Sequence, residues 1–230
     1  QPQLDMLGFA LTRQGIGLSD HFYHDGDDTA AALAILHAAG YIVDPSILQR
    51  FRGNGVYYAF AGEMQMSLSL TARAVHALRL FGLRDETAIQ FLLDTQGENG
   101  RWKDDKWHIS WLYNTLHLVL ALAPEPEGYN AMMHAQTDLI HNQHPDGGWG
   151  VTREATPSET AYAVLALYAL HKENLLTEAG RRAFLKGQTY LKDASIREDL
   201  VPMSLWIEKE LYMPPRIEKM FEMAALLVSI

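Results

Sequence analysis

Three aspartates, Asp25, Asp27 and Asp28, lie within four positions, immediately before an apolar stretch, AAALAIL (30–36). Carboxyl groups this close share protons as coupled groups, because they cannot all ionise without repelling one another. A helix that begins here also directs backbone N–H groups toward the anion left when one carboxyl gives up its proton. The cluster can therefore contain an acid that is both protonated and strong.

Two other interpretations of the cluster stay open. It could be an acidic helix cap, which needs no chemistry at all. It could also be a Ca²⁺ loop, although an EF-hand loop needs further spaced oxygen ligands and a late bidentate Glu, and residues 30–36 offer none.

Composition excludes several other kinds of chemistry. The 230 residues include no Cys, so thiolate metal sites, disulfides and a cysteine nucleophile are excluded, and a reducing compartment fits. A formal net charge of −9 provides no electrostatic attraction to nucleic acid or to an anionic membrane. We expect a cytoplasmic protein, because the sequence has no membrane-spanning apolar run and no signal peptide at its start. A chain that begins with Gln is expected to be a processed product or a fragment.

The apolar periodicity that must position these residues is helical almost throughout. Three segments rich in small residues (27–39, 109–123, 158–172) have the pattern of buried helices, and three amphipathic segments (85–96, 130–143, 177–192) have the pattern of outer helices. Segments 67–81 and 214–230 are also expected to be helical. Residue pairs Asp85–Glu86, Ser158–Glu159 and Thr177–Glu178 resemble helix caps with acidic first turns. Almost no strand pattern is visible, so an all-α fold is predicted.

A repeat coincides with this alternation of helices. Gln96 and Trp102 recur as Gln143 and Trp149, both displaced by 47 residues, with a Gly-rich turn inside each copy. The Gln amide can bond free backbone groups of the turn, and the indole can pack beneath it. A third copy, at 183–192, has lost its Gly-x-Trp ending. Inner and outer helices alternating at a period near 45 residues predict an α/α toroid of helical hairpins, an incomplete α6-α6 barrel.

The DxDDTA string at 25–30 and the two Gln…Gly-x-Trp repeats resemble motifs of the class II terpene cyclases, relatives of the squalene-hopene cyclases. Further stretches resemble bacterial diterpene cyclases: SLSLTARAVHAL (67–78), DKWHISWLYNT (105–115), PSETAYAVLAL (157–167) and LWIEKELYMPPRI (205–217). The resemblance implies that residues 1–230 form a single domain, the C-terminal larger part of a β domain. It also implies that the γ domain belongs to a missing N-terminal part or to a second chain.

The same resemblance implies an isomerase that starts cyclisation by protonating an alkene, with Asp27 as proton donor and Asp25 and Asp28 as supporting carboxyls. Geranylgeranyl diphosphate giving a bicyclic copalyl-type diphosphate is the first expectation, and farnesyl diphosphate giving a drimane diphosphate is the near variant. Squalene fits less well, since the repeats are few. Mg²⁺ is expected through the substrate diphosphate, and no protein metal site is identified.

A growing carbocation is stabilised by aromatic faces, since a good base or water would quench it too early. Thr71 stands where related cyclases carry Asn near the acid, and Trp111 stands where Pro is expected in the 105–115 segment. Arg101 and Lys103 are weaker basic candidates beside Lys106 for a diphosphate. The residues expected to bind substrate are Trp107, His108, Tyr113, Thr71, Tyr58, Trp206 and Lys106.

Other classes compete with this hypothesis. A protein prenyltransferase β subunit has a similar toroid, but its zinc site uses a Cys that this chain lacks. A class I terpene synthase needs a DDxxD motif, and DGDDT is not one. A non-catalytic toroid that requires a partner domain remains an alternative.

Overall fold

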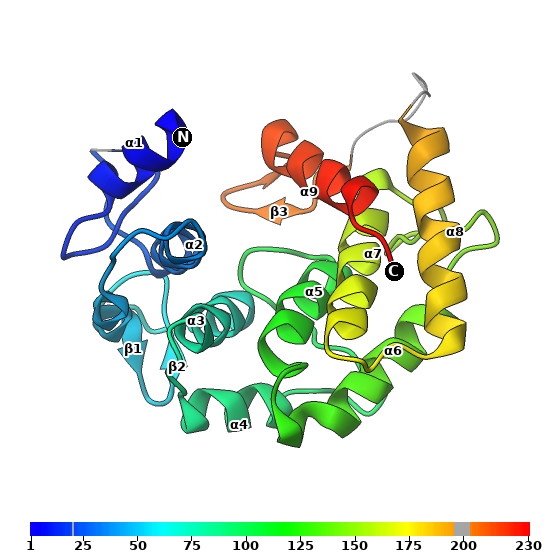
Figure 1. Ribbon diagram of the computed structural model, residues 1–230, viewed down its shortest axis with the longest axis horizontal. Helices are drawn as coiled ribbons and strands as arrows, with labels where there is room; N and C mark the ends of the chain where they lie inside the picture. The colour runs from blue at the N-terminus through cyan, green and yellow to red at the C-terminus, as the bar shows by residue number, and fades with distance from the viewer. Residues whose placement is uncertain (20, 196–202) are drawn as a thin grey trace. The chain divides into compact units, whose positions relative to one another are not determined.

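The computed structural model describes residues 1–19, 21–195 and 203–230, and these residues are mostly helical (Figure 1). The all-α prediction is confirmed, and each predicted helix occurs within three residues of its expected ends. The helices are α1 (Pro2–Ala10), α2 (Gly26–Ala38), α3 (Leu68–Leu80), α4 (Glu86–Asp94), α5 (Trp111–Leu122), α6 (Tyr129–His141), α7 (Pro157–Lys172), α8 (Glu178–Ala194) and α9 (Pro215–Leu227), with 3₁₀ helices η1 (Pro45–Phe51) and η2 (Pro126–Gly128).

Side-chain caps begin most of these helices. Asp25 caps α2, Ser67 caps α3 and Thr177 caps α8, each accepting a backbone N–H from the first turn. The expectation that Ser158 caps α7 is wrong. Pro157 occupies the first helical turn, so the cap moves back to Thr156, whose hydroxyl accepts the Glu159 N–H at 3.2 Å.

The chain forms two compact units. Unit 1 comprises Gln1–Asp94, and its core is made where α2 packs on α3 and η1. Leu33, Leu36, Leu48 and Leu70 are fully buried there. No residue of α1 is buried, and this helix was not predicted from the sequence.

Unit 2 comprises Thr95–Ile230 and is built around α7, which contacts α5, α8 and α9 (Figure 1). All residues from Trp111 to Val119 of α5 are buried, whereas α8 buries one face only. The predicted distinction between inner and outer helices is therefore confirmed for α5, α7 and α8.

Each repeat Gln ties its own Gly-rich turn to the outer helix that follows. The Gln96 amide donates to the carbonyls of Gly100 in its own turn and Ala131 in α6, both at 2.9 Å. The Gln143 amide donates equivalently to Gly147 at 2.8 Å and to Ala183 in α8 at 2.9 Å. Both repeat tryptophans, Trp102 and Trp149, are fully buried. The predicted role of the repeats is confirmed.

Two short antiparallel ladders interrupt the helical pattern. Strands β1 (Arg52–Gly53) and β2 (Val56–Tyr57) pair in unit 1, and β3 (Trp206–Ile207) and β4 (Leu211–Tyr212) pair in unit 2. Two residues are too few to show a period of two, which is why the sequence did not reveal them.

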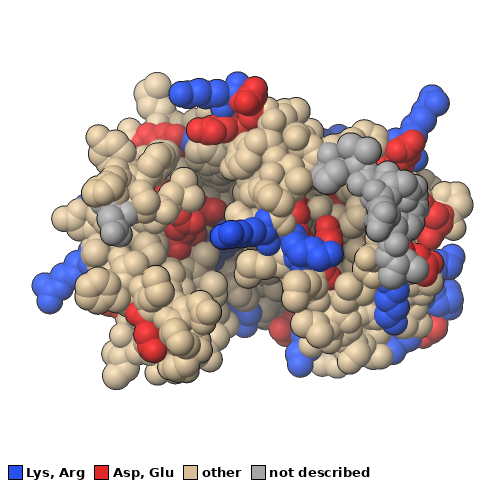
Figure 2. All heavy atoms as spheres, turned by 90° about the horizontal axis from the view of Figure 1, so that it is seen from above, with Lys and Arg blue, Asp and Glu red and all other residues tan. Residues whose placement is uncertain are grey.

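Figure 2 shows basic and acidic side chains interspersed among the described residues. Within the described residues, no helix is both long enough and apolar enough to cross a bilayer.

Candidate active site

The acidic motif forms the first turn of α2. Asp25 is 8% exposed, and one of its carboxylate oxygens accepts the Asp28 N–H at 2.7 Å. Burial raises the pKa of Asp25 to about 7; the Asp28 N–H opposes this, and the charges of Asp28 and Asp27 add to it. At neutral pH Asp25 is therefore a carboxyl that can hold a proton.

Asp27 meets a different partner from its neighbours. Its Oδ2 accepts a hydrogen bond from Nη1 of Arg73, on α3, at 3.0 Å, and both side chains are partly buried. A guanidinium at this distance stabilises a carboxylate. The sequence prediction did not include Arg73, although a lone Arg within the mostly buried helix 67–78 is a signal that could have been used.

Backbone contacts hold the motif in place. The Gly26 N–H donates to the Ala59 carbonyl at 2.8 Å, and a Cβ on Gly26 would lie only 2.8 Å from the Tyr58 carbonyl oxygen. Glycine is required at this position because the backbone of another segment approaches so closely.

A loop is attached to the same helix start. The Thr29 hydroxyl donates to the Asp25 carbonyl at 2.5 Å and accepts the Ile16 N–H at 3.1 Å, while the Asp25 N–H donates to the Ile16 carbonyl. Asp25 is therefore fixed by its backbone on one side and by its side-chain cap on the other.

Thr71 has a structural role. Its hydroxyl donates to the Ser67 carbonyl at 2.7 Å and accepts the Tyr57 N–H at 3.1 Å, so it ties β2 to α3. Its only proton is used in the first bond, so within the protein Thr71 links two backbone segments. Tyr58, also expected to bind substrate, contributes its backbone to the close approach at Gly26, and its ring would touch a Cβ on Gly53.

In unit 2, three of the expected aromatic residues come together. The His108 ring stacks on Tyr113 with centroids 4.3 Å apart, and the Trp206 ring meets both at 5.1 Å. His108 and Tyr113 are 1% exposed. His108 Nδ1 accepts the Ser110 N–H at 3.0 Å, which places its remaining proton on Nε2 in the neutral form.

Further residues of this aromatic cluster were not predicted. Tyr162 and Phe221 join it with centroid distances of 5.4 Å (Tyr113–Tyr162) and 5.0 Å (Tyr162–Phe221). Glu218 is buried, and its carboxylate accepts the Tyr162 hydroxyl. Tyr162 lies within the 157–167 segment and Glu218 directly follows the 205–217 segment, so both were close to motifs already singled out.

Lys106 and Trp107 lie next to the aromatic cluster in sequence. The Lys106 ammonium lies 4.6 Å from the centroid of the Trp107 ring, and burial lowers the pKa of Lys106. The Trp107 carbonyl accepts the Ile207 N–H, which ties this segment to β3.

Arg101 makes structural contacts instead. Its guanidinium pairs with Asp138 at 2.6 Å and lies over the Trp111 ring at 4.0 Å. The guanidinium is thus held by protein partners, and Trp111, at the position expected to hold Pro, packs against it.

The carboxylates do not form a metal-binding set. Asp25 is bonded to a backbone N–H and Asp27 to Arg73, and no group of three or more His, Cys, Asp or Glu in the described ranges could hold a metal ion. The residues present therefore do not fit a protein-bound Mg²⁺.

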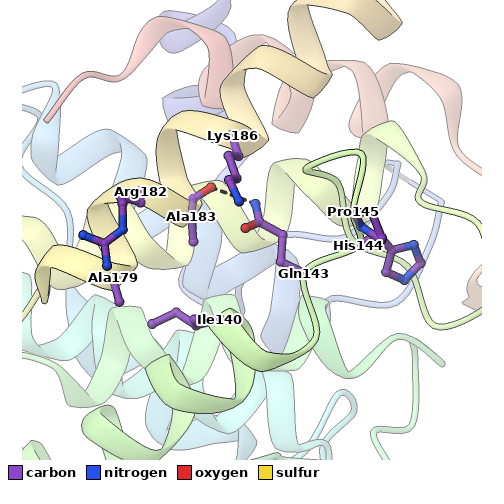
Figure 3. Close-up of a pocket in the computed structure, with 8 residues that line it drawn as sticks. All are labelled: Ile140, Gln143, His144, Pro145, Ala179, Arg182, Ala183 and Lys186. Carbon is purple, nitrogen blue, oxygen red and sulfur yellow. Dashed lines mark hydrogen bonds between the residues drawn. The ribbon is translucent and has the colours of Figure 1, made fainter.

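A surface pocket of about 310 Å³ opens between α6 and α8 in unit 2 (Figure 3). Gln143 lies in it with its amide directed at the Ala183 carbonyl, and Arg182 and Lys186 line the α8 side. None of the residues expected to do chemistry lines this pocket.

Known proteins resemble this chain in both fold and sequence. These similarities identify the chain as a class II diterpene cyclase-like protein. Residues 65–199 match the squalene-hopene cyclase C-terminal domain, and the chain belongs to this family. The chain is 44% identical over 227 residues to a (+)-kolavenyl diphosphate synthase of Herpetosiphon aurantiacus, covering 99% of this chain and 43% of the relative. It is 32% identical over 203 residues to a copalyl diphosphate synthase of Streptomyces anulatus, covering 83% of this chain and 36% of that protein.

Among solved structures, ent-copalyl diphosphate synthase from Streptomyces platensis aligns with a TM-score of 0.85 and 30% identity, over 97% of this chain and 45% of that one. This similarity confirms the predicted α/α toroid class. The chain thus spans less than half the length of these relatives.

Proposed function

We propose that this chain carries the acid site of a class II diterpene cyclase acting on geranylgeranyl diphosphate. The product would be a bicyclic diphosphate of the copalyl type. The names of the relatives support a diterpenyl diphosphate product, and the 44% identical relative makes a kolavenyl-type diphosphate the nearest alternative.

The observation that carries the proposal is the carboxyl cluster at the start of α2, in which Asp25 is buried and Asp27 is partly buried. A proton passes from a carboxyl O–H to the terminal alkene carbon, the internal alkene electrons close the rings, and a proton leaves from carbon at the end. No atoms are gained or lost, and the C–O bond to the diphosphate stays intact. An alkene is a very weak base, so the acid must be strong and kept from water.

The three aspartates take separate roles in this proposal. Asp27 is the proton donor by its position in the motif, and Arg73 stabilises the carboxylate that remains after transfer. Asp25, with its pKa raised to about 7, is protonated in about half of the molecules at neutral pH and can return a proton to the cluster. Asp28 supports Asp25 through its backbone N–H and its nearby carboxyl.

Mg²⁺ enters only as a companion of the substrate diphosphate, since Asp25 and Asp27 are engaged with protein partners. Lys106 is the chain's basic candidate for contact with the diphosphate. A partner domain of the γ type, in the same polypeptide or a second chain, completes the enzyme.

The test is incubation of the chain, with and without a γ-type domain supplied, with geranylgeranyl diphosphate and Mg²⁺, followed by dephosphorylation and mass-spectrometric detection of a bicyclic alcohol. Asp27→Asn should abolish the product. Asp94→Asn, an exposed aspartate of the same unit that bonds only Gln90 among its described contacts, should leave it unchanged.

Product formation that survives Asp27→Asn would remove Asp27 from the mechanism. Turnover of farnesyl but not geranylgeranyl diphosphate would support the drimane alternative. A chain that gives no product even with a γ-type domain supplied would favour the non-catalytic alternative.

A further inference from the structure

Glu218 is a buried carboxylate that accepts hydrogen bonds from two aromatic side chains. It lies on α9 and is 4% exposed. The Tyr162 hydroxyl lies 2.8 Å from Oε1 and 2.7 Å from Oε2, and the Trp206 indole N–H donates to Oε1 at 2.5 Å. Because burial of a charge is costly, these charge-assisted bonds are needed to hold it there.

The two donors belong to the aromatic cluster. The Tyr162 ring meets His108 edge-on at 5.6 Å and Tyr113 at 5.4 Å, and the Trp206 ring meets the same two residues at 5.1 Å. Glu218 therefore fixes two rings that come from different elements, α7 and β3, in one arrangement.

Hydrogen bonding to a carboxylate also changes the rings themselves. A phenol or indole that donates to an anion gains electron density, so the negative face of its π-system attracts cations more strongly. Burial first, and then the charge of Glu218, raise the pKa of Tyr162, which keeps its hydroxyl protonated and donating.

Glu159 is another buried carboxylate in this unit, and it is hydrogen-bonded to hydroxyl and backbone donors instead of aromatic ones. It accepts the Ser110 hydroxyl at 2.7 Å, the Val151 N–H at 3.0 Å and the Thr156 hydroxyl at 2.9 Å, so it fastens the loop before α7. Glu218 therefore differs from Glu159 in that its hydrogen-bond donors are aromatic side chains.

We propose that Glu218 is a positioning residue that turns Tyr162 and Trp206 into a binding site for a hydrocarbon cation. The inference rests on the proposed function, since the cation would be the cyclising intermediate. On this proposal, Glu218 strengthens the binding of a cationic ligand and has little effect on the binding of an uncharged ligand of the same shape.

The experiment compares two ligands on the full 230-residue chain by titration calorimetry. One is a prenyl diphosphate analogue with a tertiary ammonium at the carbon that becomes cationic, and the other is its uncharged carbon counterpart. Glu218→Gln keeps the shape and removes the charge, and it should weaken binding of the ammonium analogue about tenfold while changing the neutral one less than twofold. Glu222→Gln, one turn further along α9 and paired with Lys219 at 3.0 Å, is the matched control and should change neither.

A ¹⁵N-indole NMR spectrum checks that the variant is folded. The Trp206 N–H resonance, assigned with Trp206→Phe, should move upfield in Glu218→Gln but stay dispersed. Equal loss for both ligands, no loss for either, or an ammonium analogue that does not bind the wild-type chain would overturn the inference. Turnover of geranylgeranyl diphosphate by the wild-type protein tests the proposed function separately.

Discussion

Asp25 and Asp27 are two residues apart and meet opposite environments. The Asp25 side chain is buried and accepts the Asp28 N–H as a helix cap, whereas the Asp27 carboxylate pairs with the Arg73 guanidinium. Pairs of carboxyls in environments this different are how proteins divide the tasks of storing a proton and stabilising an anion.

Asp25→Asn should make the chain more stable at alkaline pH. The pKa of Asp25 is raised in the folded state, so between about pH 4 and 7 the folded chain binds more protons than the unfolded one. The stability that Asp25 contributes is present at low pH and is lost as the pH rises through 7. Asn keeps the cap without the charge, so urea denaturation should show a gain of about 1–3 kcal/mol at pH 8 that shrinks toward pH 5.

Asp44→Asn is the control for that titration. Asp44 also caps a helix, η1, but the Ser46 hydroxyl and N–H lower its pKa, so its contribution has the opposite sign. The control variant should gain nothing at pH 8. An Asp25→Asn variant that gains equally at pH 5 and pH 8 would contradict the assigned burial effect.

Arg73→Gln should impair the proton transfer more than it impairs folding. The ion pair with Asp27 is partly exposed, so its loss should lower the free energy of unfolding by less than about 1 kcal/mol. Loss of the cation that stabilises the Asp27 carboxylate should lower kcat by about 10- to 100-fold, and Arg73→Lys should recover part of it. Arg84→Gln removes a pair with Glu86 on the surface of the same unit and should leave kcat unchanged. Equal kcat values for Arg73→Gln and the wild type would exclude the assigned role.

The start of α2 is fixed by segments from three places in unit 1. The Ile16 loop meets it through Thr29, the Ala59 segment through Gly26, and α3 through Arg73. The acidic turn is therefore positioned by contacts 13 to 46 residues away in sequence, and not by its own helix alone.

Gly26→Ala should test this packing directly. The added Cβ would lie 2.8 Å from the Tyr58 carbonyl and 3.2 Å from Leu70 and Phe51 side chains, so the neighbouring backbone must move. We expect a loss of about 1–3 kcal/mol in thermal denaturation, together with lower activity. Gly8→Ala, within α1 and in ordinary contact at 3.5 Å, should instead be neutral or stabilising. A Gly26→Ala variant as stable as the wild type would show that the close approach is not required.

The sequence predicted the elements better than it predicted the contacts between them. The helices followed from apolar periodicity, and the Gln–Trp repeat followed from a spacing of 47 residues, because both signals are local or periodic. The cap of α7 was misplaced because Pro157 shifts the helix start by one residue, and the two-residue strands carry no period. Arg73, Tyr162 and Glu218 escaped because their partners lie 46 and 56 residues away, and side-chain pairing over such distances leaves no pattern in one sequence.

At the scale of the whole molecule, the chain supplies the acidic motif in unit 1 and the aromatic cluster in unit 2, and spans 43% of its 44% identical relative. A carbocation reaction needs a site from which water is excluded on every side. We therefore expect catalysis to depend on the additional part that the relatives possess.

The chain alone should show less than about 1% of the turnover of a chimera that joins it to the remaining part of the Herpetosiphon aurantiacus relative. In the chain alone, water would quench the cation or solvate the aspartate cluster and make it a weaker acid. Both are compared at equal concentration with geranylgeranyl diphosphate, by quantifying the dephosphorylated bicyclic product. The chimera carrying Asp27→Asn controls for activity from the added part and should be inactive. Equal turnover by the chain alone would show that these 230 residues enclose the reaction by themselves, and a chimera that stays active with Asp27→Asn would place the acid outside this chain.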